Sequence, residues 1–75
     1  MRRAGTVVRV AQGLVVCRAD DDSRPDIGTR VVDDSLQDVG TVVDVFGPVD
    51  RPYLAVDPDD DVHPPAVVGD TLYVR

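Results

Sequence analysis

Two of the four common charged residues are missing from this chain of 75 residues, which contains no lysine and no glutamate. All fourteen acidic residues are aspartate, all eight basic residues are arginine, and the net charge is −6 at pH 7. Aspartate has the shorter apolar stem of the two acids, and arginine forms stronger bidentate ion pairs than lysine. A high-GC genome would still encode some lysine and glutamate. The composition therefore favours a cytoplasm with molar salt, as in a haloarchaeon.

Cysteine and long apolar runs are also scarce. Cys17 is the single cysteine, so it forms no internal disulfide and supplies no zinc site alone. Its neighbours are typical of a strand, and we interpret it as a core residue and not as a reactive thiol. No stretch approaches the roughly 18 apolar residues of a membrane span, and the opening residues lack the apolar core of a signal peptide. We expect a cytoplasmic protein with no membrane partner.

The small size and the negative charge exclude further classes. A chain of this length buries only about 60% of its unfolded surface, so a deep active-site cavity is not expected. A net charge of −6 repels phosphate, and the longest basic run is Arg2-Arg3, so direct nucleic-acid binding is not expected either. In molar salt the Debye length is about 3 Å, which leaves apolar contacts to recognise a partner. We predict a non-catalytic binding domain.

What the chain does contain is valine, at seventeen positions, in short runs separated by glycine, proline or aspartate. Such punctuation is typical of strands, and no window shows a helical period longer than two turns. Six strands with no helix to cover a sheet close most economically into a small barrel. We predict one all-β barrel domain over residues 1–75, with strands at Gly5–Val10, Leu14–Arg18, Arg30–Val32, Val39–Phe46, Tyr53–Val56 and Thr71–Arg75.

The connections follow from the turn residues. Ala11-Gln12-Gly13 is short enough to make a hairpin of the first two strands. Asp20–Asp26 is a predicted solvated loop, and Asp33–Asp38 is a predicted reversal. The segment Asp57–Asp70 contains three prolines and is predicted to be a long loop that cannot form a central strand.

Within that loop, Asp57, Asp59 and Asp61 have the spacing of the first half of an EF-hand calcium loop. The motif then fails, because Val62 and Val68 stand where the loop requires glycine and glutamate. We interpret the segment as a solvated acidic loop and predict no metal site.

Two hypotheses of catalysis are also disfavoured. A dimeric aspartic protease needs Asp-Thr/Ser-Gly, whereas the nearest strings are Asp70-Thr71-Leu72 and Asp34-Ser35-Leu36. His63 is the only histidine and has no Ser, Cys or second His near it in sequence, so it is interpreted as a surface residue and not as a general base. We predict no catalytic residue and no cofactor.

The segment Val45–Leu54 differs from the rest of the chain. It places the only phenylalanine and one of two tyrosines around Gly47-Pro48 and Pro52. Proline fixes the backbone, and rigid apolar or aromatic side chains are preferred anchors of interfaces. At least one of Phe46 and Tyr53 is expected in the barrel core, which leaves the other for a partner.

At this segment the sequence resembles a known family. The string Val39–Val56, which includes Val45-Phe46-Gly47-Pro48-Val49 and Pro52-Tyr53, closely resembles the signature of the archaeal glycine-arginine-rich-type (Gar) protein of the H/ACA ribonucleoprotein. The likeness continues in order through Gly5-Thr6-Val7, Gly13–Val16, Arg30–Gly40 and Val68–Val74, and so covers nearly the whole chain.

The resemblance implies a closed six-stranded barrel of the reductase/isomerase/elongation-factor type and a non-catalytic role. Such a protein docks on the catalytic domain of a dyskerin-like pseudouridine synthase, positions its mobile thumb loop, and promotes guide-directed rRNA modification and product release. The H/ACA guide RNA is contacted only indirectly, through the complex, and no small-molecule ligand is implied. The chain ends at Arg75 without a glycine-arginine-rich tail, and its acidic loop Asp57–Asp61 departs from the more basic loop of typical members.

Carried over residue by residue, the resemblance places partner binding on one segment. Spacing alone leaves open which of these side chains face the partner and which face the core. The predicted residues are Val45, Phe46, Gly47, Pro48, Val49, Pro52 and Tyr53.

A second small barrel is the alternative. The PRC-type barrel of ribosome-maturation proteins shares a Val-Val-Asp-Asp…Val-Gly-Thr-Val-Val-Asp-Val pattern and binds a ribosomal protein. The turn Phe46-Gly47-Pro48 and the following Pro52-Tyr53 favour the first family.

Overall fold

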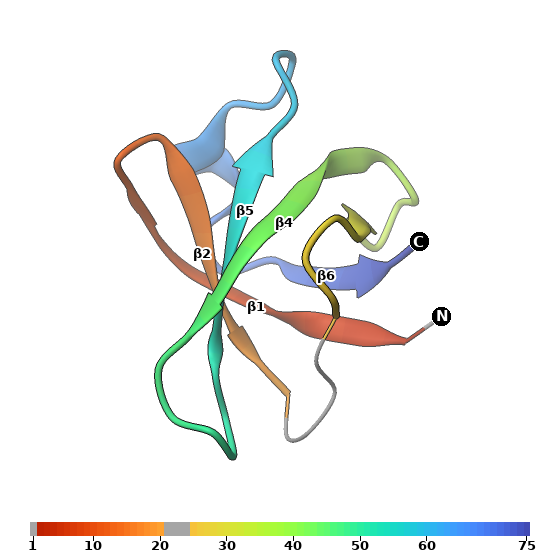
Figure 1. Cartoon of the computed structure of the whole chain (residues 1–75). Helices are drawn as coiled ribbons and strands as arrows, with labels where there is room; N and C mark the ends of the chain where they lie inside the picture. The colour runs from red at the N-terminus through yellow and green to blue at the C-terminus, as the bar shows by residue number, and fades with distance from the viewer. Residues whose placement is uncertain (1, 21–24) are drawn as a thin grey trace.

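Each predicted valine-rich run forms a strand, and the strands close into a barrel (Figure 1). The computed structural model describes residues 2–20 and 25–75. The order around the barrel is β1-β2-β5-β4-β3-β6, and all neighbouring strands are antiparallel. The prediction of an all-β, closed six-stranded barrel is therefore confirmed. The strands are β1 (Arg3–Ala11), β2 (Leu14–Ala19), β3 (Arg30–Val32), β4 (Asp38–Phe46), β5 (Tyr53–Pro58) and β6 (Thr71–Val74).

The segment after β5 was predicted to be loop from Asp57, and there the structure differs. Strand β5 continues to Pro58, which lies opposite Gly40. Proline is tolerated at this position because the last residue of a strand need not donate to the ladder. Further on, a short 3-10 helix η1 (Pro64–Val67) starts on two prolines, whose fixed φ suits the first turn of a helix. Of the predicted loop Asp20–Asp26, residues 21–24 lie outside the described part of the chain.

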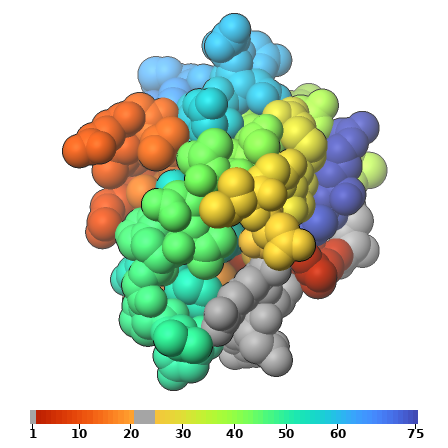
Figure 2. All heavy atoms as spheres, viewed as in Figure 1, coloured from red at the N-terminus to blue at the C-terminus, as the bar shows by residue number. Residues whose placement is uncertain are grey.

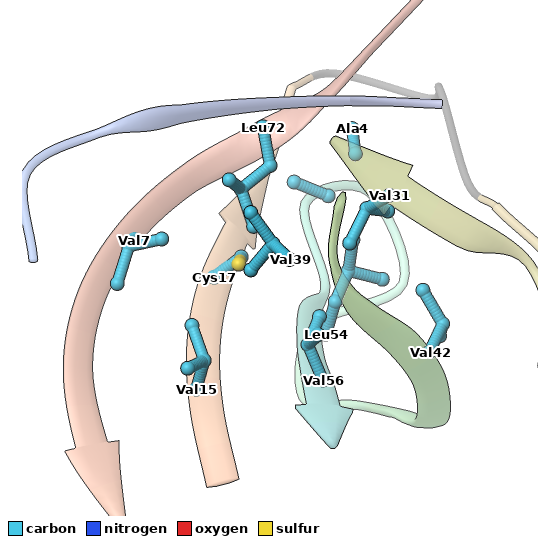
Figure 3. Packing of buried hydrophobic residues seen from close by; sticks show 11 residues of the cluster. Ala4, Val7, Val15, Cys17, Val31, Val39, Val42, Leu54, Val56 and Leu72 are labelled. Carbon is cyan, nitrogen blue, oxygen red and sulfur yellow. The ribbon is translucent and has the colours of Figure 1, made fainter. Parts of the chain in front are cut away.

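The barrel is filled by small apolar side chains (Figure 3). Cys17 is among them with no exposed surface, and burial raises the pKa of its thiol to about 12. A thiol with such a pKa is not ionised at neutral pH, so the interpretation of Cys17 as a core residue is confirmed. The cluster consists of Ala4, Val7, Val15, Cys17, Ala19, Val31, Val39, Val42, Leu54, Val56 and Leu72.

The two halves of the chain repeat one three-strand unit. Gly-Thr-Val-Val occurs at residues 5–8 in β1 and at residues 40–43 in β4, and each strand has a bulge at the last valine of this motif. The backbone bonds repeat as well: Gly69 N donates to Val7 O at 2.9 Å, and Gly28 N donates to Val42 O at 2.7 Å. Strand β6 therefore pairs with β1 in the same way as β3 pairs with β4. The barrel has an approximate two-fold arrangement, which the sequence analysis did not detect.

The repeated glycines are required by close approach of the backbone. A Cβ on Gly5 would lie far inside van der Waals contact with the carbonyl of Arg18, and one on Gly40 would do the same with the carbonyl of Asp57. These glycines allow β1 to cross close to β2 and β4 to cross close to β5. The tight curvature that closes so small a barrel depends on them.

Candidate partner-binding surface

The hairpin of β4 and β5 projects from one end of the barrel and carries the predicted binding segment (Figure 1). The last pair of this hairpin is Phe46 with Tyr53, and residues 47–52 connect them. We call residues 46–53 the β4–β5 ridge. In the space-filling view it forms the lower, green-to-teal edge of the molecule (Figure 2).

Phe46 and Tyr53 stack on each other outside the barrel. Their ring centroids lie 5.6 Å apart with an interplanar angle of 23°. Phe46 is 39% exposed and Tyr53 is half-buried, and neither belongs to the core cluster. The expectation that at least one of the two lies in the core is therefore wrong. Valine, leucine and cysteine already fill the interior, so the aromatic pair remains on the surface.

The turn itself is shaped by Gly47, whose φ of +88° is in the left-handed region. A Cβ at this position would also lie 3.0 Å from the ring of Tyr53, so the turn and the aromatic stack are coupled. Pro48 and Val49 follow and are both exposed, Val49 to 78%. An exposed apolar side chain beside a fixed Gly-Pro turn loses little conformational entropy when it is bound.

The remaining predicted residues support the ridge from beneath. Pro52 is buried, and its carbonyl accepts a hydrogen bond of 2.9 Å from the amide of Ala19 on β2. Val45 is half-buried and packs against the core cluster. The structure thus brings all seven predicted residues to one hairpin and separates them into an exposed group, Phe46 to Val49, and supporting residues.

Arginines that the sequence analysis did not select surround the aromatic stack. Arg18 donates from Nη1 to the Tyr53 hydroxyl at 3.0 Å, and its guanidinium carbon lies 5.2 Å from the ring centroid. Arg9 lies over the same ring at 6.0 Å. Arg51, within the ridge, donates from Nε to the carbonyl of Ala19 at 3.4 Å, a long bond.

These contacts follow from the register of the sheet. Arg18 lies opposite Tyr53, and Tyr53 lies opposite Phe46, so the three form one row across β2, β5 and β4. The next outward row runs from Arg9 through Val16 and Ala55 to Asp44. Val16 and Ala55 are buried and yet absent from the core cluster, which fits coverage by their long neighbours on the outer face.

At the opposite end of the β4–β5 hairpin, Asp59 is committed to an ion pair. Arg30 donates from Nη1 to Oδ1 at 2.9 Å and from Nη2 to Oδ2 at 2.6 Å. This hydrogen-bonded pairing lowers the pKa of Asp59 and raises the pKa of Arg30. The acidic run that resembles half a calcium loop is therefore partly used to tie β3 to the end of β5.

The other candidates of the sequence analysis stay apart. Asp34 and Asp70 are both exposed in connections, and His63 is exposed at the rim of a polar depression that it shares with Asp38, Asp59 and Arg75. Among residues 2–20 and 25–75 no group of three or more His, Cys, Asp or Glu side chains is arranged to hold a metal ion. Within the same residues, no helix is long and apolar enough to cross a membrane.

One sequence signal would have found part of the missed site. Period-two alternation puts Val15 and Cys17 inside the barrel, and so puts Arg18 outside it. The contact of Arg9 with Tyr53 was not accessible in this way, because it depends on the placement of β2 between β1 and β5.

Comparison with known proteins gives two findings. The family model described as "Gar1/Naf1 RNA binding region" matches residues 1–75, which is the whole chain. A protein of Methanothermobacter thermautotrophicus, named only as an uncharacterized protein, is 31% identical over 78 residues, covering 99% of this chain and 83% of that relative.

Proposed function

The chain belongs to the family of the Gar1/Naf1 RNA binding region, and on this basis we propose that it is a non-catalytic subunit of an H/ACA ribonucleoprotein that docks on the catalytic domain of a dyskerin-like pseudouridine synthase. One observation carries the proposal. The Gly47-Pro48 turn presents Phe46, Pro48 and Val49 to solvent as a fixed apolar projection. Such a projection suits insertion into a pocket of a protein partner.

Within that particle we propose the role that the resemblance implies. Docking positions the mobile thumb loop of the synthase, and this promotes turnover and product release during guide-directed pseudouridylation of rRNA. The expected signature is kinetic: omission of the chain should slow multiple-turnover modification more than a single turnover.

The family description names RNA binding, and we propose that contact with RNA is made mainly through the complex. The chain has a net charge of −6, and direct binding to phosphate depends on clustered cationic side chains. A mobility shift with guide RNA at physiological salt and micromolar affinity for the pure protein would contradict this part. The PRC-type alternative is not proposed, because the family match covers the whole chain.

We also propose that the protein works in a cytoplasm with molar salt, as in a haloarchaeon. Fourteen carboxylates against eight guanidinium groups repel one another when they are not screened. Thermal melts should show a lower melting temperature in dilute buffer than in molar potassium chloride. An equal or higher melting temperature in dilute buffer would oppose halophily and leave the docking proposal intact.

The docking proposal is tested by titration calorimetry with a cognate synthase catalytic domain. Pro48→Ala and Val49→Ala should each weaken binding by about 1–3 kcal/mol, the range for residues near the centre of an interface. Asp60→Ala, an exposed change beyond the far end of the hairpin, should stay within about 0.5 kcal/mol. If Asp60→Ala weakens binding and the ridge variants do not, the barrel docks by another face.

A further inference from the structure

The seven described arginines differ in whether an aspartate lies within ion-pair distance. Arg3, Arg30 and Arg75 are paired with aspartates at 3.1, 2.6 and 2.6 Å, respectively. Among the described carboxylates, Arg9 and Arg18 have no ion-pair partner, although the chain holds nearly two acids for every base. Arg2 and Arg51 have no described aspartate within ion-pair distance either, but of these four arginines only Arg9 and Arg18 lie over one ring, that of Tyr53.

Arg18 is also incompletely satisfied. Its Nη1 bonds the Tyr53 hydroxyl at 3.0 Å, whereas its Nε is buried and has no hydrogen-bond partner. A buried donor of a charged group without an acceptor is costly, and a counter-charge would recover that cost. The arrangement holds a guanidinium in place beside the ridge while one of its donors is unused.

From these contacts we infer that the Arg9–Arg18 pair receives an acidic side chain, Asp or Glu, of the docked protein partner. The inference rests on the proposed function, because the same partner must cover Phe46 and Val49. A carboxylate that approaches the guanidiniums beside the Tyr53 ring would be attracted by both positive charges and would balance one of them, and a small shift of Arg18 would give its Nε an acceptor. The ridge would then bury apolar surface against the partner, and the two arginines would fix the orientation in which the partner docks.

A protein carboxylate suits this site better than an RNA backbone. Acidic residues interrupt the cations on this surface, because the row that contains Arg9 ends in Asp44 and Asp50 precedes Arg51 in the ridge. Successive phosphates of an RNA backbone would therefore meet carboxylates as well as arginines. The neighbours Pro48 and Val49 are apolar and offer no donor to a phosphate or base. A single carboxylate at the edge of an apolar interface therefore fits this site better than a chain of phosphates.

The test is titration calorimetry of the full chain with the synthase catalytic domain at two potassium chloride concentrations at which all variants are folded by thermal melts. Arg9→Gln and Arg18→Gln should each raise Kd about tenfold or more and should reduce its dependence on salt. Arg75→Gln is the matched control, because it removes the same charge at the other end of the hairpin, where Arg75 pairs with Asp38. Its Kd should change less than about twofold.

Two further arms identify the anion. Arg18→Lys keeps the positive charge but loses the planar guanidinium that can bind a carboxylate through two hydrogen bonds. Its affinity for the synthase should lie between those of the wild type and Arg18→Gln. Charge reversal at Arg9 should be rescued by one acid-to-arginine change in the synthase, and a complete scan of the facing acids without rescue would oppose a protein carboxylate. Arg9 is exposed, so its variants report on binding even where Arg18 variants fold poorly.

The outcomes separate this inference from the proposed function. If Val49→Ala weakens binding while Arg9→Gln and Arg18→Gln do not, the docking surface stands and the carboxylate site is wrong. If Val49→Ala has no effect either, both are wrong. Binding of a single-stranded RNA oligonucleotide by the pure protein, weakened by Arg9→Gln and not by Arg75→Gln, would assign the arginines to RNA and overturn the inference.

Discussion

The two halves of the barrel have the same strand register and differ at one hairpin end. In the first half, β1 and β2 end on the pair Ala11–Leu14, joined by the two residues Gln12 and Gly13. In the second half the corresponding pair is Phe46–Tyr53, and residues 47–52 join it. The barrel closes equally well with either connection. Strand register alone therefore does not require the six-residue loop and its aromatic pair, which supports our proposal that they bind a partner.

The outward charges differ in the same way. Arg9 and Arg18 of the first half correspond to Asp44 and Asp57 of the second. Inward positions stay small and apolar in both halves, whereas the sign of the charge changes on the outer face. The repeat thus separates positions that are fixed by packing from positions that are free to serve a partner.

The largest effect on stability is expected at the two repeated glycines, where the halves should respond alike. Gly5→Ala and Gly40→Ala each force a Cβ against a backbone carbonyl of the next strand. We expect each to lower the free energy of unfolding by about 3 kcal/mol or more, in the upper range for overpacking. Urea denaturation measures both.

Gly13→Ala is the control, since its Cβ would meet nothing and only its positive φ is unfavourable. It should cost about 1 kcal/mol. Tolerance of alanine at only one of the two repeated glycines would break the equivalence of the halves.

The next prediction exchanges the connections. The variant replaces residues 46–53 by Ala-Gln-Gly-Leu, the sequence of residues 11–14, so that the β4–β5 hairpin receives the short turn of the β1–β2 hairpin. Synthase binding should fall more than about 100-fold, equivalent to about 2.7 kcal/mol, because the whole ridge is removed. Stability should fall by only about 1–2 kcal/mol, since the main loss is the hydrogen bond from Ala19 to Pro52 and the aromatic stack. Calorimetry and urea denaturation report the two effects separately, and a variant that still binds would place the interface elsewhere.

A smaller effect on stability is expected for Phe46→Ala. A side chain in the core would cost roughly 3–5 kcal/mol on truncation. Phe46 is exposed to 39% and stacks only on Tyr53, so we expect about 1 kcal/mol, the scale of an aromatic pair. Leu54→Ala, fully buried on the same hairpin, should cost about 2–5 kcal/mol and serves as the reference. Similar values for the two variants would contradict the placement of Phe46 on the surface.

The smallest effect concerns pH and the far end of the hairpin. The folded pKa of Asp59 is lowered by its hydrogen bonds to Arg30, so its contribution to stability is full above the unfolded pKa of about 3.9 and is lost as pH falls through the folded value. The stability difference between wild type and Asp59→Asn should be constant near neutral pH and should shrink below about pH 4. Urea denaturation across pH 2–7 tests this expectation, and a difference that persists unchanged at pH 2 would argue against the pair.

Much of this molecule could be predicted from its sequence, for physical reasons that also explain the gaps. Six short apolar runs, most of them rich in valine, have turn residues between them and so favour strands, and the number and shortness of these strands favour closure. The end of β5 was missed because a strand tolerates proline at its last residue, as at Pro58. The ridge was located because Gly47-Pro48 leaves few alternatives for the chain. The orientation of Phe46 was not predictable, since it depends on whether the interior is already full.

The two-fold repeat has a consequence for the ancestry of this barrel. Strand β3 pairs with β4 and β6, which both belong to the second half, while β6 returns to pair with β1. Each half thus donates its third strand to the other, as protomers do in a domain-swapped dimer. Two copies of a peptide of about half this length would present the same edges to each other. Duplication and fusion of one such peptide is a simple route to this barrel, after which the two hairpin ends were free to diverge.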